Sequence, residues 1–357
     1  MEPWFGQDET NEINAYLAEG GWMTEFRRTA KFEEQIAKYT GAKHCIVVNN
    51  GTISLTLAAI VCGIGYGDEV IIPNYTMIAS PNSIKMIGAV PVFVDVEPET
   101  LCLDIALVEK AITSKTKAIM LVTANGRSPK AGIEAFVELA AKHGLKLIED
   151  AAQSLGSFYP NGTHMGLMGE VGSFSFSAPK VISTGQGGAL VTNNDEIATK
   201  LRKLKDFGRS GGGNDIHDSI GYNFKFTELQ ACLGVVQMEK LEWRVNRKKE
   251  ILILFKTHLK SCSGIQFFEQ NLQNTTPWFI DAKVEKRTEL IEFLKSENIG
   301  TRIMYPPINR QIAYNVEGNF PVSEEIGNSG LWFPSASQLE DESILRICLA
   351  INNFYNN

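Results

Sequence analysis

The feature that most constrains the fold of this chain is an alternation of two patterns that repeats through its N-terminal half. A short apolar run, rich in β-branched residues, is followed by a polar or glycine-containing turn, and then by apolar residues at three- and four-residue intervals. The first pattern indicates a strand and the second an amphipathic helix. Strands that alternate with helices need crossover connections, so the pattern predicts an α/β fold with a mostly parallel sheet buried on both faces.

The expected elements follow from the positions of these runs. We predict strands at residues 45–48, 69–73, 91–96, 118–123, 145–150, 172–177 and 188–192, and helices at 54–62, 105–113 and 133–143. Ligands of such sheets bind beyond the carboxyl ends of the strands. Functional residues are therefore expected where the runs end, at residues 49–52, 74–80, 123–129, 150–153 and 175–180.

The pattern changes after Gly208. Residues 208–219, GRSGGGNDIHDS, are rich in glycine and polar side chains and predict a loop. A long helix is expected at 227–258, followed by a smaller α/β unit with strands near 278–284 and 300–304. We expect a large domain over residues 1–245 and a small C-terminal domain over 246–357, with the N-terminal segment a candidate to pack on the small domain.

Composition excludes several classes of function. A net charge of -7 argues against nucleic acid as a partner, because phosphate backbones need clustered Lys and Arg. The 6 cysteines contain no C-x-x-C pair, so we expect neither a disulfide framework nor a zinc site, and no metal. The N-terminus is acidic and lacks a signal pattern, and no apolar run approaches the length of about 20 residues that a membrane helix needs. We therefore expect a cytoplasmic protein with no membrane partner.

Two strand ends carry candidate reactive side chains. The apolar run 145–150 ends in Asp150, a carboxylate above a buried sheet that would seek a cationic partner; the alternative is a helix N-cap, which Asp also favours. Every second residue of the run 172–177 from Ser173 on is a serine, including Ser175. The turn that follows contains Lys180 and precedes a glycine-rich segment. A lysine on a loop is usually a solvated charge, but a lysine amine with a lowered pKa forms Schiff bases with carbonyls.

A third strand end is a candidate phosphate site. Gly51 and Thr52 follow the run 45–48 and open a helix, whose free N–H groups and dipole favour an anion. The segment matches neither the P-loop spacing nor the dinucleotide fingerprint, which disfavours a nicotinamide-dependent dehydrogenase. A phosphate cradle, a carboxylate and a Schiff-base lysine are together what pyridoxal 5'-phosphate (PLP) requires.

At this point the sequence resembles the PLP-dependent sugar aminotransferases of the DegT/DnrJ/EryC1/StrS family, which have PLP fold type I. The resemblance extends over nearly the whole chain. It is carried by GGWMT (20–24), FEEQIAKYTGAKHCIVVNNGT (32–52), GDEVIIPNYTMIAS (67–80), GAVPVFVDVEPET (88–100), IEDAAQSLGS (148–157), SFSFSAPKVISTGQGGALVTNN (173–194), IGYNFKFTELQACLGVVQMEKL (220–241) and INNFY (351–355).

The resemblance implies a role for each matching residue. Lys180 would hold the cofactor covalently and move protons between it and the substrate. Asp150 would pair with the ring nitrogen, and Gln153 would lie near the ring hydroxyl. The phosphate would be bound by Gly51, Thr52 and Ser175, and by Asn223 from a second subunit, which implies a homodimer with shared sites.

Departures from the family pattern fall on the substrate side. Met77 stands where an aromatic residue usually stacks on the ring, Arg127 replaces part of a His-containing motif, and Gln186 replaces an acidic residue. Arg28 lies in another changed stretch. Met77 is expected to contact the cofactor, whereas Arg28, Arg127 and Gln186 are candidate substrate contacts of an atypical acceptor, for which neutral drift is the alternative. Arg302 and Tyr305 match a family stretch near the mouth of the site, whereas Trp278, Trp332 and Phe333 are expected in the core of the small domain.

The resemblance implies transamination between an amino acid, L-glutamate by analogy, and a keto sugar. The commonest acceptor in the family is a nucleotide-linked 4-keto-6-deoxy sugar used for polysaccharide or lipopolysaccharide. Two alternatives stay open. One is an aminotransferase for a free keto sugar acid of the 8-keto-3-deoxy-octulosonate type, which the arginines would suit. The other is a PLP-binding homologue that has lost catalysis.

Overall fold

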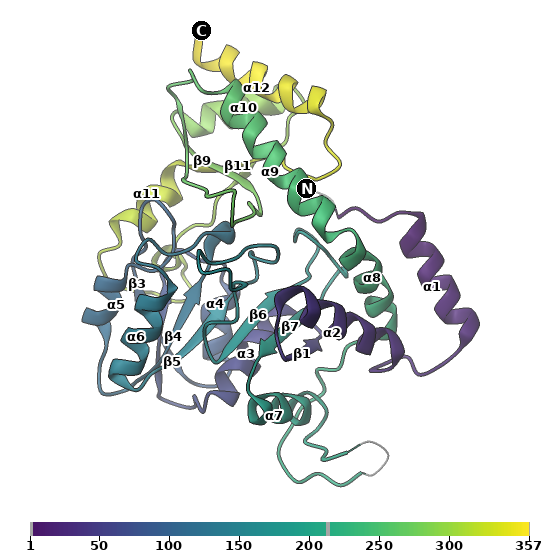
Figure 1. Cartoon of the computed structure of the whole chain (residues 1–357). Coiled ribbons are helices and arrows are strands. Elements are labelled where there is room, and N and C mark those ends of the chain that lie inside the picture. The colour runs from purple at the N-terminus through teal and green to yellow at the C-terminus, as the bar shows by residue number, and fades with distance from the viewer. Residues whose placement is uncertain (1–2, 212–214, 357) are drawn as a thin grey trace.

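The computed structural model describes residues 3–211 and 215–356. Part of the predicted loop 208–219, residues 212–214, therefore lies outside the described residues. Figure 1 shows two layers of structure, with the C-terminal elements stacked on a large central sheet. Among the described residues, no helix is both long enough and apolar enough to cross a membrane.

The central sheet confirms the predicted α/β class. Its seven strands lie in the order β1-β7-β6-β5-β4-β2-β3, and all pairs are parallel except those that β7 makes with β6 and β1. The strands are β1 (His44–Val48), β2 (Glu69–Pro73), β3 (Val90–Val94), β4 (Thr116–Val122), β5 (Lys146–Asp150), β6 (Val171–Ser175) and β7 (Gly188–Thr192). Every predicted strand of this half is present, and β2 and β7 have the predicted bounds.

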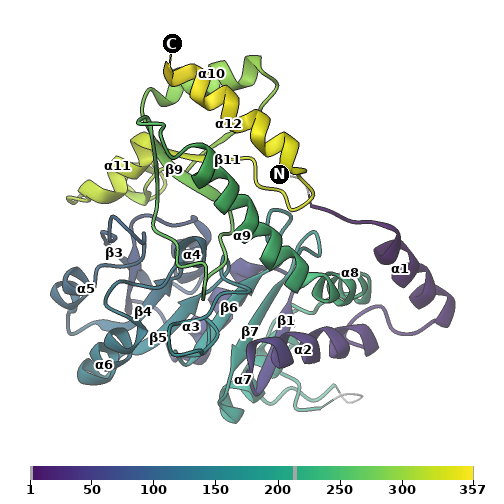
Figure 2. The same ribbon diagram turned by 45° about the horizontal axis from the view of Figure 1, so that its top comes forward.

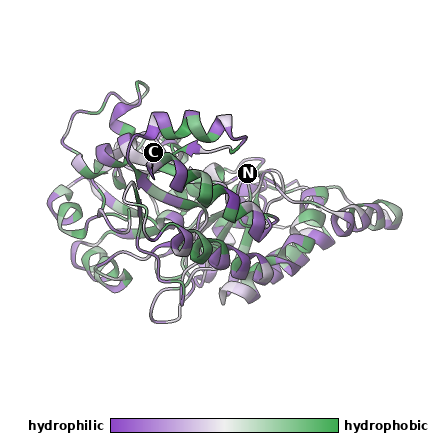
Figure 3. Cartoon of the chain, turned by 90° about the horizontal axis from the view of Figure 1, so that it is seen from above, coloured by the Kyte–Doolittle hydropathy of each residue, from purple (hydrophilic) through white to green (hydrophobic). Residues whose placement is uncertain are grey.

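Helices cover both faces of this sheet because its strands alternate between two apolar faces. Ile46, Ile72 and Ile148 pack with α3 (Gly51–Val61), α4 (Ala79–Lys85) and α7 (Asp195–Lys205). The opposite face packs with α2 (Arg27–Thr40), α5 (Ile105–Ala111), α6 (Ile133–His143) and α8 (Glu228–Glu239). Figure 3 shows hydrophilic and hydrophobic residues alternating along single helices, as expected for helices with one buried face.

The second sheet is smaller and antiparallel. Its strands, in the order β10-β11-β9-β8, are β8 (Ile265–Phe267), β9 (Ile280–Val284), β10 (Arg302–Ile303) and β11 (Gly330–Phe333). The helices of this part are α9 (Leu241–His258), α10 (Arg287–Ser296), α11 (Pro321–Ser329) and α12 (Asp341–Asn356). Short 3-10 turns lie at Ala124–Gly126 and Ile308–Arg310.

The predicted single helix 227–258 is wrong, because the structure has two helices there. The backbone of Lys240, with φ -93° and ψ -4°, separates α8 from α9. Figure 2 shows α9 rising from the layer of the large sheet into the C-terminal layer. Its first turns, at Leu241 and Val245, belong to the core of the large sheet, whereas Ile251 and Phe255 belong to the core of the small sheet. The proposed boundary at 245/246 thus falls inside a helix shared by both cores.

The N-terminal helix α1 (Gln7–Glu19) packs along α8. The side chain of Glu9, only 1% exposed, accepts hydrogen bonds from Gln237 at 2.7 Å and from Lys240 at 2.9 Å. Trp4, which precedes the helix, lies against Trp243 at the start of α9, with ring centroids 5.3 Å apart. These contacts place the N-terminal segment over the junction between α8 and α9.

Candidate active site

The ends of several strands meet at one edge of the central sheet. In the registers of β7 with its two neighbours, Gly188 pairs with Val48 at the end of β1 and with Ser175 at the end of β6. In the next pair, Asp150 at the end of β5 lies beside Ser173 of β6. The sheet therefore brings the segments that follow β1, β5 and β6 together, as the prediction from parallel strands requires.

Lys180 lies in the turn after β6, with its amine held against an aromatic face. Its Nζ is 4.1 Å from the ring centroid of Trp278. Burial lowers the pKa of Lys180 to about 8, and the charge of Asp150 opposes that shift. The amine is thus neutral in a substantial fraction of molecules near neutral pH, as a nucleophilic lysine must be.

Asp150 is 5% exposed, and its carboxylate is held by a relay of hydroxyl groups. Ser80 donates to Asp150 Oδ2 at 2.7 Å, and the hydroxyls of Ser80 and Thr76 are 2.9 Å apart. Burial raises the pKa of Asp150, and the hydrogen bond from Ser80 opposes the rise. In the described part of the chain no helix begins at Asp150, so the N-cap alternative does not apply.

The neighbouring carboxylate, Glu149, has a different environment. It is fully buried and accepts hydrogen bonds from the Tyr159 hydroxyl and from the backbone N–H groups of Gly166, Met168 and Gly169. Its hydrogen-bonding capacity is therefore used to hold the loop before β6. Of the two adjacent acids, Asp150 is the one that faces Lys180.

The N-terminus of α3 forms a cradle suited to a phosphate. The side chain of Asn50 caps the helix by accepting from the N–H of Ile53 at 2.9 Å, which leaves the N–H groups of Gly51 and Thr52 for a ligand. A Cβ atom on Gly51 would lie only 2.9 Å from the Cβ of Ser175, so glycine is needed for this close approach. The structure therefore brings Gly51, Thr52 and Ser175 together as predicted.

Two further predicted residues lie beside this group. Gln153 lines a small cavity together with Ser175, Lys180 and Trp278. Its side-chain oxygen accepts from the backbone N–H of Asn125 at 2.7 Å, which fixes its orientation. Met77 lies just after Thr76 of the hydroxyl relay and is 43% exposed.

Arg302 and Tyr305 approach the same site from the small domain. Arg302 lies near enough to Lys180 for its charge to lower the pKa of that amine, and its guanidinium is 5.5 Å from the ring centroid of Trp332. Tyr305 packs edge-on against Trp332, with ring centroids 4.7 Å apart. A cleft of about 550 Å³ is lined by Pro179, Thr301, Arg302 and Trp332, among others.

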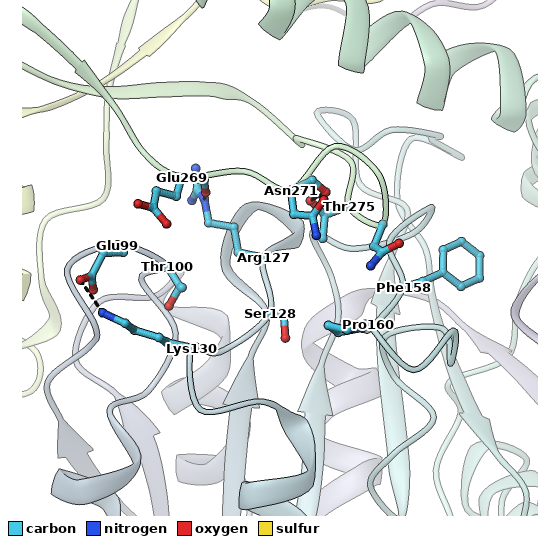
Figure 4. A pocket seen from close by; sticks show the side chains of 11 residues that line it. Glu99, Thr100, Arg127, Ser128, Lys130, Phe158, Pro160, Glu269, Asn271 and Thr275 are labelled. Carbon is cyan, nitrogen blue, oxygen red and sulfur yellow. Dashed lines mark hydrogen bonds and ion pairs between the residues drawn. The ribbon is translucent and has the colours of Figure 1, made fainter.

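Arg127 lies between the large and small sheets, where it lines a small cavity with Gln153 and Tyr305. It is 3% exposed and forms a buried ion pair with Asp281 of β9, and its Nε donates to the backbone oxygen of Glu269 at 3.0 Å. It lines a cavity of about 200 Å³ in which Lys130 pairs with Glu99 at 2.9 Å (Figure 4). Neither Lys180 nor Asp150 lines that cavity.

The remaining candidates lie away from Lys180 within this chain. Arg28 forms ion pairs with Glu12 and Glu19 of α1. Gln186 is an exposed turn residue whose backbone oxygen accepts from Gln230 at 2.7 Å. Asn223 is exposed, and its backbone bridges to Asp206.

Sequence reasoning missed two residues of the site. Trp278 was expected in the core of the small domain, but it is 1% exposed in the cluster that packs against the large sheet, and it donates from Nε1 to the backbone oxygen of Pro179 at 2.7 Å. Ser80, at the start of α4, was not singled out although it binds Asp150. Ser80 lies in the strand-end segment 74–80, where functional residues were expected. The sequence around Trp278 contains no motif that indicates a functional role.

The assembled groups fit PLP by their chemistry. An amine with a lowered pKa, a buried carboxylate and an anion cradle match the aldehyde, the ring nitrogen and the phosphate of that cofactor. In the described part of the chain, no group of three or more His, Cys, Asp or Glu could hold a metal ion. The site is therefore arranged for an organic phosphate cofactor.

Comparisons with known proteins agree with this reading. The model of the DegT/DnrJ/EryC1/StrS aminotransferase family matches residues 4–352. GDP-perosamine synthase of Escherichia coli O157:H7 is 36% identical over 330 residues, covering 91% of this chain and 90% of that protein. A dTDP-3-amino-3,6-dideoxy-alpha-D-galactopyranose transaminase of Aneurinibacillus thermoaerophilus is 34% identical, covering 98% and 96%. The crystal structure of S. venezuelae DesV superposes with a TM-score of 0.92 at 32% identity, covering 98% of this chain and 94% of that one.

Proposed function

Because the chain belongs to the DegT/DnrJ/EryC1/StrS aminotransferase family and is a PLP-dependent sugar aminotransferase, we propose that it moves the amino group of L-glutamate to a nucleotide-linked 4-keto-6-deoxy sugar. In the overall reaction, glutamate becomes 2-oxoglutarate and the keto group of the sugar becomes an amine. The product would serve polysaccharide or lipopolysaccharide synthesis in the cytoplasm. The observation that carries the proposal is the placement of Lys180 beside Asp150, next to the cradle at the N-terminus of α3.

Each residue of the site has a separate task in this proposal. PLP, when bound, supplies an electron sink that stabilises negative charge at the carbon that loses a proton. Lys180 holds the cofactor and then carries protons with its Nζ, for which an amine that is partly neutral near neutral pH is suited. Asp150 pairs with the ring nitrogen, and the hydroxyl of Ser80 keeps the Asp150 carboxylate in place.

The cradle at the N-terminus of α3 and the ring of Trp278 hold the cofactor and shield Lys180. Gly51, Thr52 and Ser175 bind the phosphate, and Gln153 lies near the ring hydroxyl. Trp278 excludes water from one side of Lys180, because its ring is buried against the amine. These roles follow from the family resemblance together with the contacts described above.

The acceptor is inferred from the open cleft and from the relatives. A cleft of about 550 Å³ beside Pro179 and Arg302 has the volume of an ordinary small-molecule site. The exposed guanidinium of Arg302 suits the pyrophosphate of a nucleotide sugar. Names of relatives, GDP-perosamine synthase and a dTDP-sugar transaminase, point to the same class of acceptor.

The arginines that would favour a free keto sugar acid are already paired. Arg127 binds Asp281 and Arg28 binds two glutamates, so neither offers its full charge to a substrate carboxylate. If Arg127→Ala leaves kcat/KM for the acceptor unchanged in folded enzyme, Arg127 makes no substrate contact. We therefore favour the nucleotide-linked acceptor.

We also propose a homodimer with shared sites. Asn223 is exposed, as a residue that serves the neighbouring subunit must be in a single chain, and it lies beside exposed apolar residues, Ile220 and Tyr222, that a partner could cover. Mixing Lys180→Ala and Asn223→Ala variants tests this arrangement. Hybrid dimers should regain activity that neither variant has alone, and no recovery in proven hybrids would contradict the shared site.

The first test is the visible absorption of the purified protein with PLP, before and after L-glutamate. We expect a band from lysine-bound PLP that is absent in Lys180→Ala, fades with glutamate, and returns when a 4-keto-6-deoxy sugar linked to GDP or dTDP is added. A band that ignores glutamate would overturn the donor. A band restored only by a free keto sugar acid would overturn the acceptor.

A further inference from the structure

The turn that carries Lys180 is held on both sides, by Trp278 and by Arg244, a residue that has had no role so far. The backbone oxygen of Pro179, just before Lys180, accepts from Trp278 Nε1 at 2.7 Å. The backbone oxygen of Val181, just after it, accepts from Arg244 Nη1 at 3.0 Å. Both flanking carbonyls are therefore fixed by side chains from outside the turn.

Lys248 stands behind Trp278. Its Nζ donates to the backbone oxygen of Trp278 at 2.9 Å and to that of Ser335 at 2.5 Å. The side chain is 5% exposed, and within residues 3–211 and 215–356 it forms no ion pair with a carboxylate. Burial and the nearby charge of Arg244 lower the pKa of Lys248 to about 7, so a large share of this amine is neutral near neutral pH. Its hydrogen bonds to the two backbone oxygens give its N–H groups partners in the buried environment.

Arg244 and Lys248 are one helical turn apart on α9, so they face the same side of that helix. Arg244 is 4% exposed, and its Nη2 donates to the backbone oxygen of Trp4 at 2.9 Å. Lys180, Arg244 and Lys248 line one shared cavity together with Trp4 and Phe279. Two buried basic side chains thus lie behind the reactive lysine, and their nitrogens donate to backbone oxygens of residues 4, 181, 278 and 335.

We propose that Arg244 and Lys248 are positioning residues for Lys180. Arg244 fixes the carbonyl of Val181, and Lys248 fixes Trp278, whose ring contacts the Lys180 amine. The inference rests on the proposed role of Lys180 as the reactive lysine. It goes beyond that role because it assigns the geometry of the amine to a turn of α9. Neither residue touches the reacting atoms, so their effect must pass through the turn 179–181 and Trp278.

The proposal makes a prediction for the protein without cofactor. Lys248→Met or Arg244→Met should loosen the turn, admit water to Lys180 and move its pKa toward the ordinary lysine value, by roughly one pH unit. The readout is the pH dependence of acetic anhydride labelling at Lys180, measured by mass spectrometry. The conservative variants Lys248→Arg and Arg244→Lys, which keep a donor and a charge, should restore most of the wild-type profile.

Arg247→Met is the matched control on the same helix. Arg247 binds Asp341 at 2.7 Å and the backbone oxygen of Leu339, so its loss weakens packing between α9 and the start of α12 without touching the turn of Lys180. It should leave the labelling profile unchanged. A change in Arg247→Met as large as that in Lys248→Met would show that general loosening, and not positioning, is responsible.

A second readout separates position from stability. In PLP-loaded enzyme, Lys248→Met should lower kcat by roughly tenfold to a hundredfold with little change in KM, because misplacement of a reacting group affects the chemical step most. If the methionine variants do not fold, Lys248→Gln, which keeps a neutral donor, replaces Lys248→Met. Unchanged labelling in folded Arg244→Met and in either folded Lys248 variant would overturn the proposal. Because labelling needs neither PLP nor a sugar, it can fail or succeed independently of the proposed reaction.

Discussion

At the scale of single residues, the buried amine of Lys180 makes cofactor loading depend on pH. Its pKa of about 8 means that the neutral, reactive form is scarce at about pH 6 and predominates above about pH 8. The rate at which the apoprotein takes up PLP should therefore rise through about pH 8 and then level off, as stopped-flow absorbance would show.

The charge of Asp150 helps to determine the pH at which the rate of PLP uptake rises. Because a nearby carboxylate favours the charged amine, Asp150→Asn should move the midpoint to lower pH. Asp195→Asn, at a surface carboxylate that pairs with Lys43, should leave it in place. A midpoint that moves upward in Asp150→Asn would contradict the assigned pairing.

His164 makes the fold itself sensitive to acid. Burial lowers its pKa to about 4, and the neutral ring is held by the backbone of Met165 at 2.7 Å and of Gly156 at 3.3 Å. Because the unfolded chain binds this proton more readily, the stabilisation is present above about pH 6.5 and is lost as pH falls toward 4. The free energy of unfolding should therefore fall by roughly 2 kcal/mol between neutral pH and about pH 5 because of this one group.

Urea unfolding near pH 7.5 and pH 5 would measure the effect of His164. The wild type should lose more stability between the two than His164→Gln, which has no proton to gain. Equal losses in the two proteins would assign the acid sensitivity to other groups.

At the scale of elements, the approach of α3 to β6 leaves no room for a side chain at Gly51. We expect Gly51→Ala to weaken PLP binding by about tenfold or more, since the added Cβ would lie 2.9 Å from Ser175 and push the cradle open. Gly65→Ala is a suitable control, because a Cβ there would meet nothing within 4 Å. Equilibrium dialysis of PLP against both variants would measure the difference.

The elements also show what local sequence can and cannot specify. The bounds of β2, β7 and α6 were predicted from apolar periodicity, because each of these segments is flanked by clear turn residues. The break between α8 and α9 was not predicted, because Lys240 is neither glycine nor proline and nothing in the local sequence interrupts the helical stretch. The antiparallel direction of β7 depends on pairing with β1 and β6, which no local pattern records.

For the site, the strand ends that hold Gly51, Asp150, Ser175 and Lys180 were predictable from the sheet. The contact between Trp278 and Lys180 was not predictable, because it joins residues 98 positions apart along the chain through the packing of the two layers. The sequence marked Arg127 as unusual but could not give its partner, Asp281, because that residue lies on the second sheet; its contact with substrate stays a prediction.

At the scale of the whole molecule, the pair of Arg127 and Asp281 joins the two sheets. Arg127 follows β4 of the large sheet, and Asp281 lies in β9 of the small sheet, 5% exposed. Arg127→Ala should destabilise the protein by about 3–5 kcal/mol, because it leaves a buried carboxylate without a partner. Chemical denaturation would measure the loss.

The double variant Arg127→Ala with Asp281→Ala distinguishes the ion pair from simple packing. It removes both charges, so it should be less destabilised than the sum of the two single variants. Additive losses would mean that the pair itself contributes little to holding the sheets together.

The position of Trp278 has a practical consequence. A ring chromophore held at Lys180 would lie within a few ångströms of this indole, a distance at which excited-state energy passes efficiently from tryptophan to a visible absorber. The chain has 5 tryptophans, and Trp278→Phe would identify the share of emission that belongs to this one. The molecule thus contains its own optical reporter, so ligand occupancy can be followed without attaching a dye.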